Sequence, residues 1–108
     1  MSYPLQITGV AQRDISQAPD YIELVLKNPK AADDLLEETE QKINALLPFP
    51  EQHPVGEDKL LAAWGVRFTQ VKNYLAFYVV GENQVTVIRF LYAKSNWLSI
   101  LKSGFPLV

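Results

Sequence analysis

The stretch that most constrains the fold runs from Val66 to Trp97, VRFTQVKNYLAFYVVGENQVTVIRFLYAKSNW. Two short turn-forming segments divide it into three apolar runs, at 66–71, 74–80 and 85–92. Runs of this length, rich in β-branched and aromatic residues and separated by such turns, are typical of an antiparallel meander. We therefore predict three consecutive strands. The middle one is expected to be central because it is almost wholly apolar.

The first half of the chain shows helical periodicity. Apolar residues at helical spacing predict a helix over 10–27, with a kink or a break at Pro19, because proline removes a backbone N–H and clashes with the preceding turn. A second helix is predicted over 29–47, with Asn28 as its cap and Pro29 at its first position. The short link between the two helices predicts an antiparallel helical hairpin.

The remaining segments complete an α+β domain. Tyr3–Ile7 is predicted as an edge strand, 59–64 as about one helical turn, and 97–102 as a helix that is capped by Ser95 or Asn96 and ends at Gly104. An apolar tail over 105–108 is expected to dock on the body, to meet a partner or to fray. We predict one domain over 1–108: an N-terminal strand, an antiparallel helical hairpin packed on a twisted antiparallel meander, and a short C-terminal helix. The second face of the sheet is expected to be open unless something binds there.

Residue types exclude several kinds of chemistry. The chain has no cysteine, which excludes disulfides, thiolate metal sites and cysteine nucleophiles. It has one histidine, His53, which rules out His–His zinc motifs, and its glycines form no phosphate-binding loop, so we expect no metal and no cofactor. The N-terminus does not resemble a signal peptide and no apolar run is long enough to span a membrane, so we expect a cytoplasmic protein.

The charges are distributed unevenly along the chain. Residues 1–58 carry four basic and eleven acidic side chains, a net charge of −7, whereas residues 59–108 carry six basic and one acidic, a net charge of +5. This asymmetry favours an anionic partner for the basic half. A solvated acidic helical face explains the same pattern equally well.

A set of basic residues with aromatic residues between them is the strongest candidate for chemistry. It comprises Arg67, Lys72, Tyr74, Tyr78, Arg89, Tyr92, Lys94 and Trp97. Cleavage of RNA needs cations around the charged transition state, a group that helps to remove the 2′-OH proton, and an aromatic surface on which a base can stack. The structural alternative is that the strand arginines pair with acidic helix residues and the aromatic residues pack in the core.

The order and spacing of many short segments resemble the RelE/ParE superfamily of type II toxin–antitoxin toxins, which includes plasmid stabilisation proteins. The resemblance covers residues 3–101. In the first half it is carried by Asp14, Tyr21-Ile22, Leu26-Lys27-Asn28-Pro29, Ala31-Ala32, Leu35-Leu36, Ile43, Phe49-Pro50 and Pro54. In the second half it is carried by Gly65-Val66-Arg67, Val71-Lys72-Asn73-Tyr74, Phe77-Tyr78, Val80, Val87-Ile88-Arg89, Leu91-Tyr92, Asn96-Trp97 and Ile100-Leu101.

The resemblance implies a small bacterial toxin that inhibits growth and is neutralised by a cognate antitoxin, whose disordered end folds as it binds. RelE-like members cut mRNA on the ribosome without a metal, and we predict this activity for the chain ahead of the two alternatives given below. As such a metal-independent endoribonuclease (mRNA interferase), this chain would use as catalytic residues Arg67, Arg89, Lys94 and Tyr92, and as RNA-binding residues Lys72, Asn96 and Trp97.

ParE-like members instead inhibit DNA gyrase without catalysis, and a third alternative is a degenerate member that binds antitoxin without toxicity. Ala93-Lys94-Ser95 stands where many relatives carry a glycine and two basic residues. Leu75 stands where some ribosome-dependent members have a catalytic arginine. Both departures keep the non-catalytic alternatives open, as do a homodimer and a toxin–antitoxin hetero-oligomer.

Overall fold

The structure of the chain, a computed structural model, describes residues 3–55 and 57–104. The order of its elements confirms the predicted strand, two helices, three-stranded meander and terminal helix. In chain order these elements are β1 (Leu5–Ile7), α1 (Gly9–Leu24), α2 (Pro29–Leu46), the 3₁₀ turn η1 (Pro50–Gln52), α3 (Lys59–Ala63), β2 (Arg67–Val71), β3 (Tyr74–Val80), β4 (Val85–Tyr92) and α4 (Trp97–Gly104). The tail over 105–108, for which we predicted docking, a partner or fraying, lies outside the described residues.

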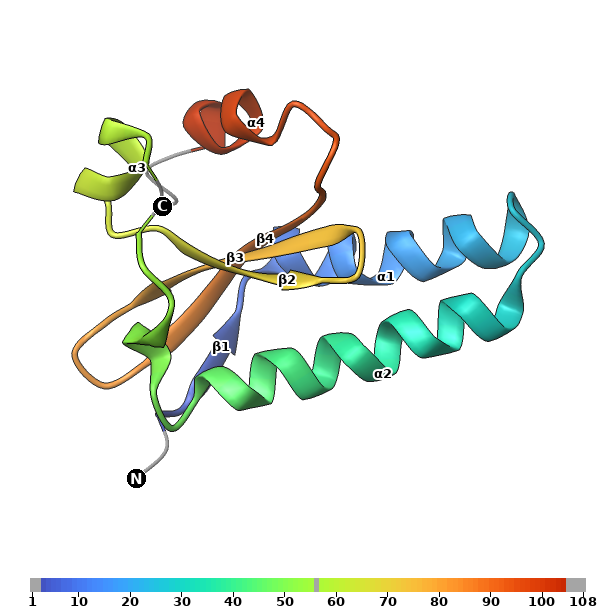
Figure 1. Ribbon diagram of the computed structural model, residues 1–108, viewed down its shortest axis with the longest axis horizontal. Coiled ribbons are helices and arrows are strands. Elements are labelled where there is room, and N and C mark those ends of the chain that lie inside the picture. The colour runs from blue at the N-terminus through green and yellow to red at the C-terminus, as the bar shows by residue number, and fades with distance from the viewer. Residues whose placement is uncertain (1–2, 56, 105–108) are drawn as a thin grey trace.

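The strands of the described residues form one sheet in the order β1-β4-β3-β2 (Figure 1). The meander of β2, β3 and β4 is antiparallel, as predicted, and β3 is central. β1 lies at the predicted edge and pairs in parallel with β4, with Leu5 opposite Val85 and Ile7 opposite Val87. The three strands of the meander are therefore antiparallel, whereas β1 is parallel to its neighbour, so the sheet as a whole is mixed.

A β-bulge interrupts the pairing of β3 with β4. Phe77 pairs with Arg89, whereas the next residue, Tyr78, pairs with Val87. Ile88 is therefore an extra residue on β4. An extra residue of this kind reverses the alternation of side chains along the rest of its strand.

The bulge makes one of our predictions wrong. For the predicted strand over 85–92, strict alternation of side chains predicts one face with Val87, Arg89 and Leu91 and another with Ile88, Phe90 and Tyr92. In the structure Val87 packs on the helical-hairpin side, whereas Leu91 lies with Ile88 in the core on the opposite side. The period of two holds only as long as no residue is inserted into the ladder.

Side chains at the start of each long helix explain where it begins. The Thr8 hydroxyl accepts a hydrogen bond from the Ala11 N–H at 3.1 Å, and the Asn28 side chain accepts one from the Ala31 N–H at 3.1 Å, as predicted for Asn28. α1 ends at Leu24, three residues before the predicted end, and it is not broken at Pro19. Pro19 is buried, as is Ala18, so tertiary packing outweighs the cost of about 3 kcal/mol that proline imposes on a helix interior.

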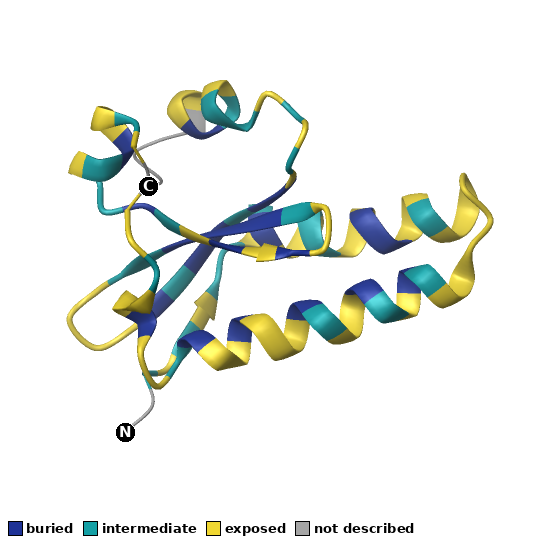
Figure 2. Ribbon diagram, viewed as in Figure 1, coloured by how far each residue is buried: buried dark blue, intermediate teal, exposed yellow. Residues whose placement is uncertain are grey.

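Helices cover both faces of the sheet (Figures 1 and 2). The face toward α1 and α2 is packed by Ala11, Ala18, Leu35, Ile43, Leu46, Val71, Ala76, Tyr78, Val85, Val87 and Phe90. The opposite face is packed against α3 and α4 by Leu61, Val66, Leu75, Phe77, Ile88, Leu91 and Leu101. The prediction of an open second face is therefore wrong. Its cover consists of two helices too short for periodicity to show which way they face. Among the described residues, no helix combines the length and the apolarity that crossing a membrane requires.

Candidate functional site

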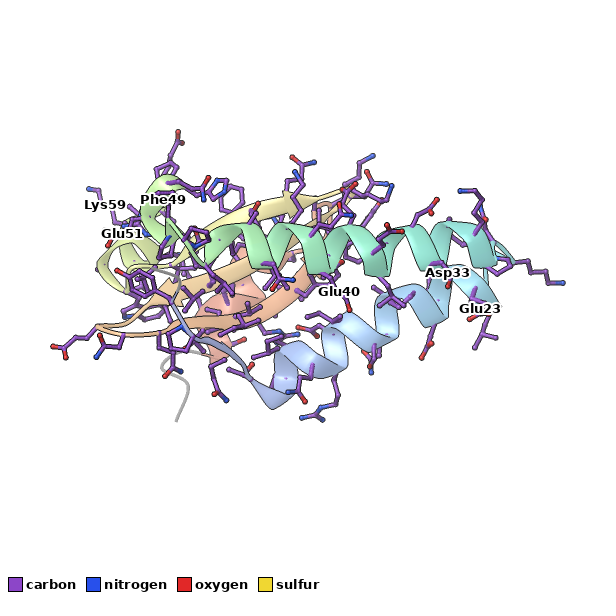
Figure 3. The ribbon with its side chains drawn as sticks, turned by 90° about the horizontal axis from the view of Figure 1, so that it is seen from below. Glu23, Asp33, Glu40, Phe49, Glu51 and Lys59 are labelled. Carbon is purple, nitrogen blue, oxygen red and sulfur yellow. The ribbon has the colours of Figure 1, made fainter. Side chains whose placement is uncertain are left out.

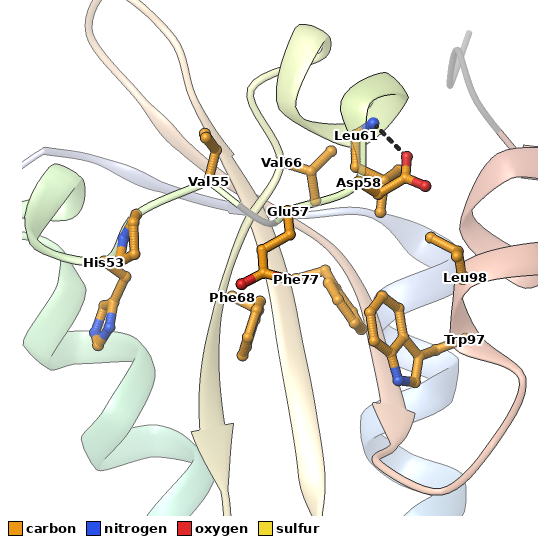
Figure 4. Close-up of a pocket in the computed structure, with 11 residues that line it drawn as sticks. His53, Val55, Glu57, Asp58, Leu61, Val66, Phe68, Phe77, Trp97 and Leu98 are labelled. Carbon is orange, nitrogen blue, oxygen red and sulfur yellow. Dashed lines mark hydrogen bonds between the residues drawn. The ribbon is translucent and has the colours of Figure 1, made fainter.

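An apolar groove with a volume of about 560 Å³ lies on the α3–α4 side of the sheet (Figure 4). We call it the aromatic groove. Its lining residues are His53, Pro54, Val55, Glu57, Asp58, Leu61, Val66, Phe68, Phe77, Trp97 and Leu98. The strands β2 and β3 form one wall, and the 53–58 segment, α3 and the start of α4 form the rest.

Three aromatic rings follow one another across the aromatic groove. Phe68 and Phe77 are cross-strand partners with ring centroids 5.9 Å apart, and the Trp97 ring lies 5.3 Å from that of Phe77. Phe77 is buried beneath the groove, whereas Phe68 is 37% exposed. Rings in this arrangement offer a large, rigid apolar surface, which suits contact with a protein side chain.

An ion pair ties together the two helices beside the groove. The Asp58 carboxylate caps α3 by accepting hydrogen bonds from the Leu60 and Leu61 N–H groups at 3.0 and 3.1 Å. It also pairs with the Lys102 ammonium of α4 at 2.9 Å. The bond to Lys102 and the two N–H donors hold the pKa of Asp58 below its ordinary value, because each of them favours the charged carboxylate.

Arg89, predicted as a catalytic residue, forms two hydrogen bonds with the Asp14 carboxylate of α1. Its Nε donates to Asp14 Oδ2 at 2.7 Å and its Nη2 donates to Asp14 Oδ1 at 3.1 Å. The same carboxylate accepts the Phe90 N–H at 3.1 Å, and both charged side chains are largely buried. The arrangement matches the structural alternative for this arginine, an architectural pair with an acidic helix residue.

Arg67, the second predicted arginine, lies at the start of β2 and holds the loop beside it. Its guanidinium donates a hydrogen bond to the carbonyl of His53 and lies 3.7 Å from the Glu51 carboxylate. Its cross-strand partner Tyr78 is fully buried and donates its hydroxyl to the Pro50 carbonyl at 2.7 Å. Burial raises the pKa of Tyr78 to about 12, so this hydroxyl is a permanent donor.

Lys72, predicted to bind RNA, occupies the tight turn between β2 and β3 with a left-handed φ of 53°. Its N–H donates to Glu38 Oε2 at 3.2 Å, and its ammonium lies 4.0 Å from Glu38 Oε1. The turn is therefore fastened to α2, on the side of the sheet away from the aromatic groove.

The other predicted site residues lie in or next to the turn that follows β4. Tyr92 is exposed and meets Tyr74 edge to face at 5.6 Å. Lys94 is exposed and makes no ion pair with any described residue. Asn96 is exposed and its carbonyl accepts the Ile100 N–H at 3.2 Å, whereas Trp97 points into the aromatic groove (Figure 4).

The predicted cations do not converge on one cavity. Arg89 binds α1, Lys72 binds α2, and Arg67 binds the loop beside β2. None of them lines the aromatic groove. Over residues 3–55 and 57–104 there is also no group of three acidic or histidine side chains placed to hold a metal. The lining of the aromatic groove, which is mainly apolar and aromatic, suits contact with apolar side chains.

Sequence reasoning missed Phe68 and Asp58 as members of the groove. The cross-strand pair of Phe68 with Phe77 depends on the register of β2 and β3, which places the two rings side by side. The tight Lys72-Asn73 turn would have given that register. No sequence signal marks the pair of Asp58 with Lys102, because the two residues meet only when α3 and α4 pack together.

Comparison with known proteins places the chain among toxins of toxin–antitoxin systems. A sequence model described as the ParE toxin of type II toxin–antitoxin systems, parDE, matches residues 5–97. No curated protein sequence matches. The chromosomal ParDE toxin–antitoxin system from P. aeruginosa contains a similar structure, with a TM-score of 0.68, 18% sequence identity, and coverage of 86% of this chain and 98% of that one. A chain of the RelBE2 toxin–antitoxin complex from Mycobacterium tuberculosis is similar too, with a TM-score of 0.59, 17% identity, and coverage of 85% and 99%.

Proposed function

The chain belongs to the family of ParE toxins of type II toxin–antitoxin systems, within the RelE/ParE superfamily, and on this premise we propose that it acts by binding a protein target rather than by cutting RNA. The target we propose is DNA gyrase, the target that ParE-like members inhibit. A cognate antitoxin neutralises the chain by binding to it. The two similar solved structures support this partner, because both come from toxin–antitoxin complexes.

The observation that carries the proposal is the two-point bond between Arg89 and Asp14. A cation that stabilises a phosphorane must be free to meet the phosphate oxygens. Releasing Arg89 would leave the largely buried Asp14 carboxylate without its partner, which is costly. Arg67 is likewise committed to the His53 carbonyl, so two of the cations that RNA cleavage would need serve the fold.

The aromatic groove supports a binding role. Phe68 is exposed on its wall, and the rings of Phe77 and Trp97 form a rigid surface behind it. Aromatic residues held rigidly in place contribute most to many protein interfaces, because little side-chain entropy is lost on binding. We assign the target contact to this groove.

The test is a supercoiled plasmid incubated with purified gyrase, ATP and the protein, followed by denaturation and electrophoresis. We expect cleaved plasmid to accumulate with the unmodified protein and addition of the antitoxin to prevent it. The Phe68→Ser variant should lose most of this effect. Leu60→Ser is the matched control, because Leu60 is exposed on α3 but does not line the groove.

A parallel assay in a translation extract tests the endoribonuclease alternative. Lys94 and Tyr92 are exposed at the end of β4 and could contact RNA. Our proposal would be overturned in favour of catalysis by two results together. The unmodified protein would cut mRNA while Lys94→Ala leaves it intact, and the plasmid in the gyrase assay would stay uncleaved. Intact mRNA and an intact plasmid at high protein concentration would favour a degenerate member.

A further inference from the structure

The free end of the α1–α2 hairpin exposes a row of large apolar residues. Leu24 is 72% exposed, Val25 60% and Leu26 58%, and the exposed rings of Tyr21 and Tyr92 line one groove with Leu26. We call these five residues the hairpin-end patch. Soluble proteins rarely expose large apolar residues contiguously unless the surface meets a partner.

The backbone under this patch is fixed by hydrogen bonds. The Leu26 N–H donates to the Tyr21 carbonyl at 3.2 Å, and the Asn28 N–H donates to the Ile22 carbonyl at 3.1 Å. Between them, Lys27 adopts a left-handed φ of 54° that turns the chain into α2. The backbone that carries the apolar side chains is therefore ordered before any partner arrives, which lowers the part of the entropy cost of binding that comes from ordering the chain.

A second groove of about 500 Å³ lies along the patch. Its lining residues are Tyr21, Ile22, Leu26, Asn73, Tyr74 and Tyr92. It joins the end of α1 to the turn between β2 and β3 and to the end of β4. The groove is on the α1–α2 side of the sheet, so it is separate from the aromatic groove.

The helices around the patch carry carboxylates that have no cation. Asp20, Glu23, Asp33 and Glu37 form no ion pair with any described residue. Glu23 on α1 and Asp33 on α2 both lie toward the free end of the hairpin (Figure 3). Of the two lysines here, Lys30 is already paired with Asp34 at 3.0 Å, and Lys27 is the single cation that faces these four carboxylates without forming an ion pair with any described residue. The surroundings of the patch are therefore negative.

We propose that the hairpin-end patch and its groove dock the apolar face of a basic amphipathic helix from a protein partner. Apolar side chains at helical spacing fill the groove along Leu26, Tyr74 and Tyr92, as in other helix-in-groove complexes. Lysines or arginines on the flanks of that helix meet Glu23 and Asp33. The inference does not depend on the target assigned above, because it does not use the aromatic groove. Of the predicted catalytic residues it uses only Tyr92, which lines the second groove.

The probe is a leucine–lysine peptide patterned as an amphipathic helix, titrated into the isotope-labelled full-length protein and followed by NMR. Two comparison peptides separate the contributions: one replaces every lysine with glutamate, and the other scrambles the order so that no apolar face forms. The protein variant Leu24→Ser/Leu26→Ser removes apolar surface from exposed positions, and Leu60→Ser is its control. Glu23→Gln/Asp33→Asn removes two charges from the surface.

We expect the patterned lysine peptide to shift signals of the residues that line the second groove and to bind more tightly than either comparison peptide. Binding should weaken by about tenfold or more in Leu24→Ser/Leu26→Ser, weaken in Glu23→Gln/Asp33→Asn, and stay unchanged in Leu60→Ser. Absence of binding, equal binding by the variants, or shifts confined to the aromatic groove would overturn the proposal. Analytical ultracentrifugation tests whether a second copy of the chain occupies the patch instead. If the protein is a dimer and Leu24→Ser/Leu26→Ser makes it a monomer, the occupant is that second copy and the proposal is overturned.

Discussion

Arg89 on β4 and Asp14 on α1, 75 residues apart in the chain, form a two-point ion pair at 2.7 and 3.1 Å. The pair fastens the first helix to the last strand next to the β-bulge at Ile88. The Asp14 carboxylate also accepts the Phe90 N–H. One carboxylate thus satisfies both the guanidinium and a backbone donor of the strand.

Removing the guanidinium should therefore destabilise the fold. Arg89→Ala leaves the Asp14 carboxylate, which is only 12% exposed, without its cation. We expect a loss of about 2 kcal/mol in the free energy of unfolding, less than for a fully buried pair because water reaches part of this one. Denaturant unfolding followed by circular dichroism measures it.

A double-mutant cycle with Asp14→Asn separates the pair from its surroundings. If the ion pair accounts for the loss of stability, the double variant should lose much less free energy of unfolding than the sum of the losses in the two single variants. Additive costs would show that Arg89 stabilises the fold through other contacts.

Tyr78→Phe should lower stability by about 1–2 kcal/mol, because the Pro50 carbonyl loses its hydroxyl donor in a buried place. Tyr74→Phe is the control, since no hydrogen bond of the Tyr74 hydroxyl occurs among the described residues. Thermal unfolding measures both variants. Equal melting temperatures for Tyr78→Phe and Tyr74→Phe would contradict the role assigned to the hydrogen bond between Tyr78 and Pro50.

Lys27→Gly should stabilise the protein relative to Lys27→Ala by about 1 kcal/mol. Lys27 has a φ of 54°, a left-handed conformation that costs side-chain-bearing residues energy and glycine little. Both variants remove the same charge, so their difference in chemical denaturation isolates the backbone effect. Equal stabilities would show that the link between α1 and α2 is not strained.

The ion pair between Asp58 and Lys102 should make stability depend on pH. The pKa of Asp58 is lowered in the folded protein from its ordinary value of 3.8. A lowered carboxyl pKa stabilises the fold above pH 3.8 and loses this contribution as the pH falls through the folded value. Asp58→Asn keeps a side-chain acceptor for the cap of α3 and removes the charge.

We therefore expect the unmodified protein to have a higher melting temperature than Asp58→Asn at neutral pH. The difference in melting temperature should shrink as the pH is lowered below about 4. Calorimetry across this range measures the difference. A difference of constant size at every pH would assign the effect of the substitution to packing.

Local signals predicted most of the fold. The meander followed from its turns and apolar runs, and the start of α2 followed from Asn28 and Pro29, because these features act over a few residues. The bulge at Ile88 and the cover formed by α3 and α4 could not be predicted, since both depend on contacts between distant segments. Pro19 belongs to the same class, because its place inside α1 is set by burial.

The candidate site was less predictable than the fold. Residue types suggested that Arg67 and Arg89 could hold phosphate, and the sequence also allowed them to be architectural. Their partners, the His53 carbonyl and Asp14, are distant in the chain, so only the packed structure reveals them. The catalytic and RNA-binding roles of all seven predicted residues stay predictions: Arg67, Arg89, Lys94, Tyr92, Lys72, Asn96 and Trp97.

Induced expression of this chain in bacteria, with rates of DNA and protein synthesis measured in the first minutes, tests the central claim that it acts on a protein target of DNA metabolism. We expect DNA breaks and arrest of DNA synthesis to come first, with mRNA uncut, and co-expression of the antitoxin to prevent both effects. Immediate arrest of translation with mRNA cut within codons, while chromosomal DNA stays intact, would contradict the claim.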